Sequence, residues 1–203
     1  MKNVLETADA LIIQYFHINN MARNADTIDY REDYYHGLSK IYFEKILKTI
    51  IEFGGLHIEK GLILDYGCGV GHLKKMLPKS NIIGYDIISE LSDTDDYKNL
   101  YPVKIVLSGV LEHLYRAEIE KLLLDFIQMN PEAELLVFLP TENLVSKIAM
   151  RLARQGNAHD DHVTKYREIN AIIERYYYIK KRKYIFLRMA QITHYVPNNK
   201  SYG

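Results

Sequence analysis

A glycine-rich loop within residues 61–73, GLILDYGCGVGHL, constrains the fold of this chain more than any other feature. An apolar run of strand length precedes the loop and a helical pattern follows it, which places Gly67, Gly69 and Gly71 at a strand-to-helix turn. Glycine at such a turn permits positive φ and lets a ligand approach the backbone, while the free N–H groups of the helix favour an anionic group. The sequence therefore predicts an α/β unit with a binding loop after its first strand.

Short apolar runs alternate with amphipathic stretches from residue 61 onward. The predicted strands are 62–66, 82–87, 103–109 and 134–140, and the predicted helices between or after them are 70–77, 116–129 and 141–154. This alternation predicts repeated βαβ units and a mostly parallel sheet, that is, a Rossmann-like three-layer α/β sandwich. A helix that begins at residue 167, followed by strands at 183–189 and 191–196, indicates a terminal antiparallel strand pair.

Two segments differ from a regular repeat of this kind. Residues 1–58 have helical patterns, with a second helix at 38–53, and are predicted as an N-terminal helical lid on a ligand-binding domain that spans 59–203. Only residues 88–102 separate the second and next predicted strands, and that length cannot hold a helix, a strand and two ordinary connections. We therefore expect the third strand to be short or missing.

Composition excludes several classes of protein. No window approaches the run of about 18 apolar residues that a membrane span needs, and Glu6 and Asp9 interrupt the stretch where a secretory signal would be apolar, so we expect a cytoplasmic protein. Cys68 is the one cysteine, which excludes an internal disulfide and argues against a structural zinc site; we expect no metal.

The formal net charge of zero hides an asymmetry along the chain. Residues 1–146 contain 14 Lys/Arg and 22 Asp/Glu, whereas residues 147–203 contain 12 and 4. A basic C-terminal portion suits an anionic ligand or surface, and a solvated face is the structural alternative. The overall neutrality and the lack of a nucleic-acid recognition motif argue against a nucleic-acid partner.

Two carboxylates indicate which ligand the loop binds. Asp86 ends the second predicted strand, fifteen residues beyond Gly71, where a carboxylate can accept both ribose hydroxyls of a nucleoside. A dinucleotide fingerprint would place its third glycine at position 72, where this chain has His72, and the carboxylate of Asp65 would repel a pyrophosphate. A nucleoside cofactor is implied, and a nicotinamide-dependent oxidoreductase is disfavoured.

The segment DYGCGVG resembles motif I of the class I S-adenosylmethionine (SAM)-dependent methyltransferases. VLSGVLEHL (106–114) and LLVFLPTEN (135–143) are similar to the fourth-strand and fifth-strand segments of the methyltransferase type 11 group, and 159–174 is similar to its entry into the last helix. The resemblance implies SAM as cofactor, with the glycine loop along its methionine part, Asp65 near its amino group and Asp86 on its ribose. The implied cofactor-binding residues are Asp65, Gly67, Cys68, Gly69, Gly71, Asp86, Ile87 and Ser108.

Further candidates come from the surrounding segments. Tyr34 and Arg31 precede the helix expected over the cofactor mouth, where a ring can face the sulfonium and a guanidinium can meet the methionine carboxylate. His113 is the candidate for a catalytic base or an acceptor-orienting group. The predicted substrate-side residues are Lys147, Arg151 and His162.

These features predict methyl transfer from SAM to O or N of a small, sugar-linked or lipid-linked anionic acceptor. Contact with an anionic membrane surface stays open, and the oligomeric state is not predicted. In the short segment 88–102, Asp93, Asp95 or Asp96 could meet the adenine amino group, or the segment could be a solvated acidic loop. The alternative function is therefore a catalytically inactive methyltransferase-like binding or scaffold domain with a degenerate adenine pocket.

Overall fold

The computed structural model describes residues 37–141, 163–186 and 188–198 of the 203-residue chain. The helices in these ranges are α2 (Gly37–Gly54), α3 (His72–Met76), α4 (Arg116–Met129) and α6 (Tyr166–Ile173). The strands are β1 (Ile63–Tyr66), β2 (Ile82–Tyr85), β3 (Lys104–Ser108), β4 (Glu134–Pro140), β5 (Tyr177–Ile185) and β6 (Ala190–Pro197). Short 3₁₀ turns are η2 (Leu56–Ile58), η3 (Ser89–Leu91), η4 (Tyr97–Asn99) and η5 (Leu111–His113). Among these described helices, none has the length and apolar character needed to cross a bilayer.

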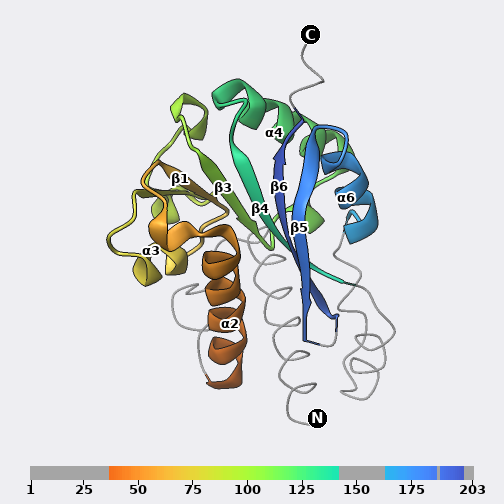
Figure 1. Ribbon diagram of the computed structural model, residues 1–203. Helices are drawn as coiled ribbons and strands as arrows, with labels where there is room; N and C mark the ends of the chain where they lie inside the picture. Colours follow the sequence, from red (N-terminus) through yellow and green to blue (C-terminus); the bar gives the residue numbers. More distant parts are fainter. Residues whose placement is uncertain (1–36, 142–162, 187, 199–203) are drawn as a thin grey trace.

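All six described strands belong to one sheet, in the order β2-β1-β3-β4-β6-β5 (Figure 1). The first four in this order run parallel, whereas β6 is antiparallel to both β4 and β5. The carboxyl ends of the parallel strands therefore share one edge of the sheet, which we call the carboxyl edge, and their first residues share the opposite, amino edge. The predicted α/β sandwich with a terminal antiparallel pair is confirmed.

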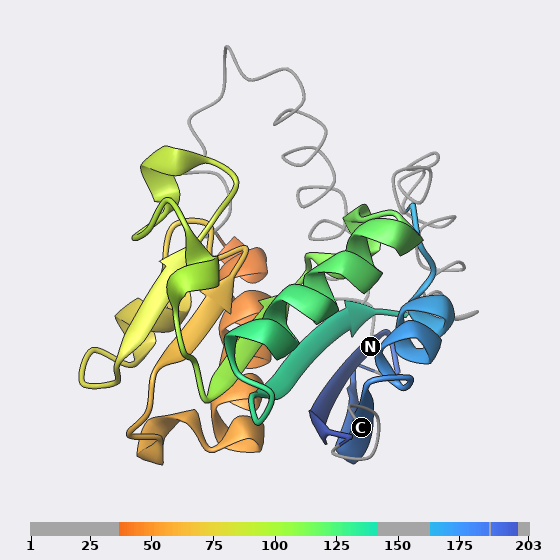
Figure 2. The ribbon, with the colours of Figure 1, turned by 90° about the horizontal axis from the view of Figure 1, so that it is seen from above.

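Helices cover both faces of the sheet because successive strand residues point to opposite sides. Ile105 and Leu107 of β3 belong to the core shared with α4 and α6, while Val106 belongs to the core shared with α2. Figures 1 and 2 show α2 on one face and α4 on the other. In α2, Ile46 and Ile50 are fully buried at helical spacing, so this helix is a layer of the sandwich. The rest of the segment predicted as a lid, residues 1–36, lies outside the described residues.

The connection between β2 and β3 contains η3 and η4 and no strand, so the prediction of a short or missing third strand is confirmed. The open edge of β2 is covered by two hydrogen bonds at Gly84: its N–H donates to Asp93 Oδ2 (2.7 Å), and its carbonyl accepts the Asp93 N–H (2.8 Å). A loop residue thus satisfies edge groups that an additional strand would otherwise pair.

Aromatic packing fixes the same connection onto the sheet. Tyr97 of η4 is 8% exposed, and its ring centroid lies 5.0 Å from that of Tyr66 and 4.7 Å from that of Tyr85. Its hydroxyl donates to Asp125 of α4 (3.0 Å). These contacts bury Tyr97 on the α4 face and hold the connection there without a regular helix.

The last helix is shorter than the sequence pattern indicated. It ends at Ile173, and β5 begins at Tyr177, six residues before the predicted strand start at 183. The residues from Tyr177 onward pair with β6 across the sheet, beginning with Tyr177 opposite Pro197. Pairing with a distant strand, together with the β preference of aromatic residues, decides this boundary.

Candidate functional site

The glycine loop joins β1 to α3 at the carboxyl edge, in left-handed backbone geometry. Gly67, Gly69 and Gly71 have φ values of 77°, 50° and 72°. The N–H groups of Gly67 and Cys68 both donate to the carbonyl of Tyr85 at the end of β2 (2.7 and 3.1 Å). The loop is therefore fixed across two neighbouring strands in a conformation that only glycine adopts cheaply.

The three glycines differ in what surrounds them. A Cβ added at Gly67 would lie 2.3 Å from Cγ2 of Val110, so this position is filled by packing. A Cβ added at Gly69 or Gly71 would meet nothing within 4 Å. The second and third glycines thus leave open space beside the backbone, where a ligand can approach the loop closely.

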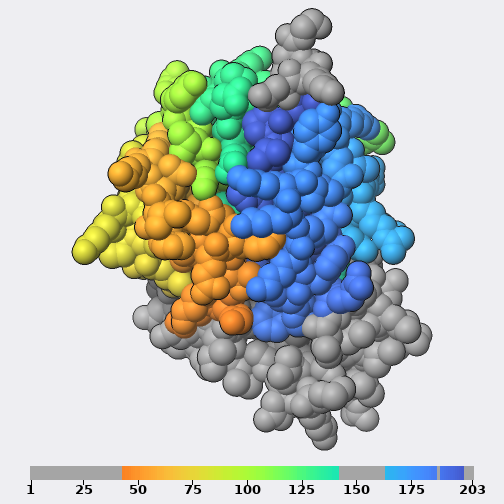
Figure 3. All heavy atoms as spheres, viewed as in Figure 1, coloured from red at the N-terminus to blue at the C-terminus, as the bar shows by residue number. Residues whose placement is uncertain are grey.

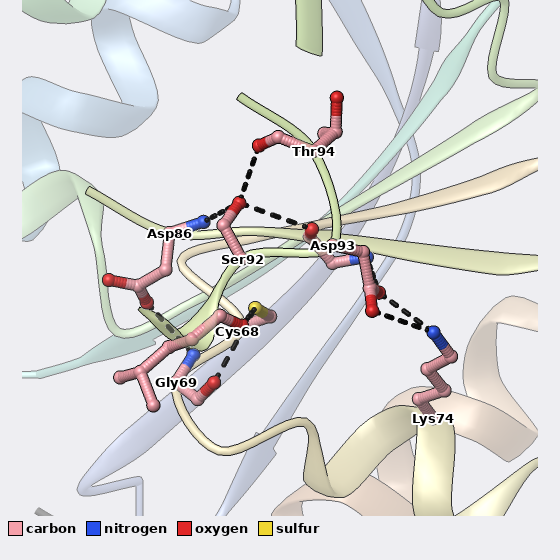
Figure 4. A network of polar contacts seen from close by, with 9 residues as sticks. Cys68, Gly69, Lys74, Asp86, Ser92, Asp93 and Thr94 are labelled. Atoms are coloured by element: carbon pink, nitrogen blue, oxygen red, sulfur yellow. Dashed lines mark hydrogen bonds and ion pairs between the residues drawn. The ribbon is translucent and has the colours of Figure 1, made fainter. Parts of the chain in front are cut away.

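Asp86 directly follows β2 and is tied to this loop. Its Oδ2 accepts the Gly69 N–H (2.9 Å) and its Oδ1 accepts the Ile88 N–H (3.1 Å), while its own N–H donates to Ser92 Oγ (3.1 Å). Figure 4 shows the carboxylate beside Gly69 and the hydroxyl of Ser92 at the backbone N–H of Asp86. Each carboxylate oxygen has lone-pair capacity beyond its one bond, so the group can still accept hydroxyl donors from a ligand.

Asp65, in β1 just before the loop, is 5% exposed. Within the described part of the chain, no hydrogen bond or ion pair to its carboxyl is found. Burial, with smaller contributions from the negative charges of Asp86 and Asp93, raises its pKa to about 7. A buried carboxyl without a partner is costly, and a ligand cation at this point would relieve the cost.

Among the residues after Asp86, one side chain is open to a ligand and others bond to the protein's own loops. Ile87 is 88% exposed, a large apolar side chain left open next to the site. Asp93 binds Lys74 Nζ through both oxygens (2.9 Å each), and Asp96 caps η4 by accepting the Lys98 N–H (2.9 Å). Of the three candidates for the adenine contact, these two acids have partners in the protein, and Asp95 is exposed.

The side chain of Cys68 points away from the open space. Its thiol contacts the carbonyl of Leu91 (3.4 Å), and it fills the position beside Gly84, where a Cβ would lie 2.7 Å from the sulfur. Burial raises the pKa of this thiol to about 12, so it is not a nucleophile.

The end of β3 contributes the other predicted residues of the carboxyl edge. Ser108 is the last residue of β3, followed by Gly109 at φ 74° and then by η5 with His113, which is half-buried. Glu112 precedes His113 and was not predicted as a site residue, although it is 2% exposed and both its carboxyl oxygens lack a hydrogen-bond partner. In the sequence, the one feature that could have indicated Glu112 is that it is a single acidic residue in an otherwise apolar segment at the end of a predicted strand.

The remaining predicted residues, Arg31, Tyr34, Lys147, Arg151 and His162, lie outside the described residues. Among the described residues, no group of three or more His, Cys, Asp or Glu side chains could hold a metal ion.

A second polar cluster lies at the amino edge. Lys104 Nζ donates to the carbonyl of Gly54 (2.6 Å) and lies 3.2 Å from Glu59 and 3.8 Å from Glu134. A groove of about 340 Å³ adjoins it, between the end of α2 and β5, which meet on the face shown in Figure 3. There Lys181 Nζ lies 4.5 Å from the ring centroid of Phe53. The acids of this cluster are paired, whereas Asp65 at the carboxyl edge has no partner among the described residues.

No family model and no curated protein sequence matches the chain. Solved structures, in contrast, do match it. The PH0226 protein from Pyrococcus horikoshii OT3 superposes with a TM-score of 0.63 at 12% identity, over 82% of this chain and 94% of that one. Magnesium protoporphyrin IX methyltransferase from Synechocystis PCC 6803, with bound SAH, gives 0.59 at 16% identity over 90% and 94%. A SAM-dependent methyltransferase from Archaeoglobus fulgidus gives 0.53 at 18% over 70% and 72%. The fold is therefore that of the class I SAM-dependent methyltransferases.

Proposed function

We propose that this protein is a SAM-dependent methyltransferase that transfers a methyl group to O or N of an acceptor molecule. One observation carries the proposal. The glycine loop leaves open space at Gly69 and Gly71. Two carboxyls flank the loop in the sequence: Asp65, buried before it with no partner among the described residues, and Asp86, which bonds to Gly69 and keeps spare acceptor capacity. Solved structures of the same fold with bound SAM and SAH support the assignment.

The chemistry of each group matches one part of SAM. The ammonium of the methionine part supplies the counter-charge that Asp65 lacks. The ribose hydroxyls can donate to Asp86, whose bond to the Gly69 N–H holds the loop in its binding conformation. The exposed side chain of Ile87 offers an apolar surface to the adenine. Resemblance to the type 11 group in particular stays a prediction.

Methyl transfer from a sulfonium needs little help from the protein beyond alignment. The methyl carbon is already activated by the positive sulfur, so an in-line approach of the acceptor supplies much of the rate. A base is needed only where the acceptor must lose a proton. His113 at the end of β3 stays the predicted orienting group, and Lys147, Arg151 and His162 stay the predicted acceptor side.

A second function is favoured by one specific observation. Asp93 and Asp96, two of the three acids available to recognise the adenine amino group, are used in the protein's own contacts. A chain that had lost SAM affinity and served as a binding or scaffold domain would tolerate this arrangement.

Calorimetric titration of the full chain with SAM and with SAH separates the two functions. We expect micromolar binding, which Asp86→Ala weakens at least tenfold through loss of the ribose contact and of the loop bond. Asp95→Ala is the matched control, since it removes an exposed acid from the same connection and should leave the affinity unchanged. No heat with either ligand at protein concentrations of about 100 micromolar would contradict the enzyme and favour the scaffold.

A further inference from the structure

Glu112 is a buried acid without a partner at the carboxyl edge, outside the cofactor site described above. Its side chain is 2% exposed, and neither Oε1 nor Oε2 has a hydrogen-bond partner in the described structure. Buried carboxyl oxygens in folded proteins are nearly always hydrogen-bonded. Two orphaned oxygens on one group therefore need a physical explanation.

The backbone around Glu112 is fixed from two directions. Its carbonyl accepts the N–H groups of Val163 (3.0 Å) and Thr164 (3.4 Å), which precede α6. Thr164 Oγ1 in turn donates to the carbonyl of Leu114 (2.6 Å), and Leu111 is fully buried in the core on the α4 face. These contacts hold η5 in place, so the burial of the carboxyl is a consequence of the fold.

An acid in this position costs stability and is not needed for packing. Burial raises the pKa of Glu112 to about 8 against the smaller opposing effect of its own backbone N–H, and no other described residue contributes to that shift. An uncharged residue of similar shape would fill the same space without the desolvation cost of the charge. Retention of such a group at the edge that carries the cofactor loop is typical of a functional carboxyl.

We propose that Glu112 is the proton acceptor for an amine substrate, an inference that rests on the proposed methyltransferase function. The substrate arrives as an ammonium ion, and one N–H proton passes to the Glu112 carboxylate, which becomes a neutral carboxylic acid. The nitrogen lone pair freed by this transfer forms the new bond to the methyl carbon of the sulfonium. The carbon–sulfur bond breaks, its electron pair stays on sulfur as a neutral thioether, and the methylated amine carries the positive charge.

Charge at the carboxyl edge favours an amine over an acidic nucleophile. Asp65 and Glu112 are both buried and have no side-chain partner among the described residues, and Asp86 adds a third carboxylate to the same edge. Lys74, beside the glycine loop, is bound by both oxygens of Asp93. An incoming ammonium would favour the ionised form of Glu112 and pair with it, whereas an incoming carboxylate would find no cation among these groups. An anionic group elsewhere in the acceptor, as the basic C-terminal portion suggests, is compatible with this arrangement.

Carbon-13 NMR of the full chain labelled at the glutamate side-chain carboxyls tests the proposal. The resonance that disappears in Glu112→Gln is assigned to Glu112, and Glu132→Gln, an exposed acid, is the matched control. In the free protein we expect this resonance to titrate near pH 8. Methylammonium is the probe, and its binding should lower the titration midpoint by roughly one pH unit. Tetramethylammonium, which has the charge but no N–H, should produce a smaller shift.

Two results would overturn the proposal. A midpoint at the ordinary glutamate value in the free protein would mean that Glu112 already has a partner. A resonance that responds equally to methylammonium and tetramethylammonium, or to neither, would mean that no N–H donor reaches the carboxyl. Calorimetry with SAM, which Glu112→Gln should leave unchanged, is measured separately. If SAM does not bind, the proposed methyltransferase function is wrong. If SAM binds but the Glu112 resonance does not respond to methylammonium, only the proposal of an amine substrate is wrong.

Discussion

Buried acids at the two edges of the sheet differ in whether the protein supplies them with hydrogen-bond or ion-pair partners. At the amino edge, Glu134 accepts hydrogen bonds from Lys180 (2.8 Å) and His194 (2.8 Å), and Lys104 bridges it to Glu59. At the carboxyl edge, Asp65 and Glu112 are more deeply buried and have no such partners within the described residues. Acids that serve the fold are paired by the fold, so the unpaired ones indicate where a ligand supplies the missing charge or donor.

The same contrast appears in the proton affinities. Hydrogen bonding, first from the Gly61 N–H and also from Lys104, lowers the pKa of Glu59. Burial alone would raise the pKa of Glu134, but the bonds from Lys180 and His194 outweigh it and the pKa is lowered. The pKa of Asp65 rises to about 7 and that of Glu112 to about 8. Rising pH therefore favours the folded state through the first pair and disfavours it through the second.

The largest effect is expected from Lys104→Met. Its side chain is 13% exposed and neutralises two acids whose side chains are only 23% and 22% exposed, so its removal takes from Glu59 its one ion-pair partner among the described residues and leaves Glu134 with Lys180 and His194 alone. We expect the free energy of unfolding to fall by about 3 kcal/mol at pH 7. Urea denaturation measures this, and calorimetry should show unchanged SAM affinity because the cofactor site is at the other edge. A loss of SAM affinity in the folded variant would show that the two edges are not independent.

Glu112→Gln is expected to stabilise the protein in alkaline solution. Because the folded pKa lies above the ordinary value of 4.5, the contribution of Glu112 is fully present below pH 4.5 and is lost as the pH rises through 8. Wild type should lose stability over this window relative to the variant, with a difference on the order of 2 kcal/mol already at pH 6. Parallel stability curves for wild type and Glu112→Gln between pH 5 and 8 would show that the acid is paired after all.

The sheet and its helices could be read from the sequence because local patterns determine them. The four parallel strands and α4 agree with the predicted ranges to within two residues, since apolar strand runs and helical spacing reflect burial directly. The start of β5 could not be read in this way. Tyr176, Tyr177 and Tyr178 suit a helix end or a strand, and only pairing with β6 decides between them.

The positions of the candidate site residues in the fold were predictable from spacing, but their contacts were not. Asp65, Asp86 and the glycines follow from their positions relative to the first two strands. That Asp86 holds Gly69, or that Asp93 is used by Lys74 and Gly84, depends on tertiary contacts that no spacing reveals. Glu112 was missed because its burial comes from the turn at Val163 and Thr164, far along the chain.

Asp65→Asn separates the effect of this unpaired acid on stability from its proposed role in SAM binding. Its folded pKa of about 7 lies above the ordinary 3.8, so the stability it contributes is complete below pH 3.8 and is lost as the pH rises through 7. We expect the variant to be more stable than wild type by about 1 kcal/mol already at pH 4.5, and to bind SAM at least tenfold more weakly. Thermal unfolding with and without SAM measures both quantities. A variant that is stabilised yet binds SAM normally would remove Asp65 from the ammonium site.

The smallest effect is expected from Lys98→Met, which sets the scale for an exposed pair. Lys98 Nζ lies 2.8 Å from Asp125 Oδ2, as short as any pair at the amino edge, but the Lys98 side chain is 47% exposed. Asp125 also keeps the hydrogen bond from the Tyr97 hydroxyl when the lysine is lost. Solvent screening should limit the loss to about 0.5 kcal/mol in urea denaturation, and added salt should reduce it further. A loss as large as that of Lys104→Met would mean that contact distance, rather than burial, decides what a charge pair is worth here, and the contrast between the two edges would lose its physical basis.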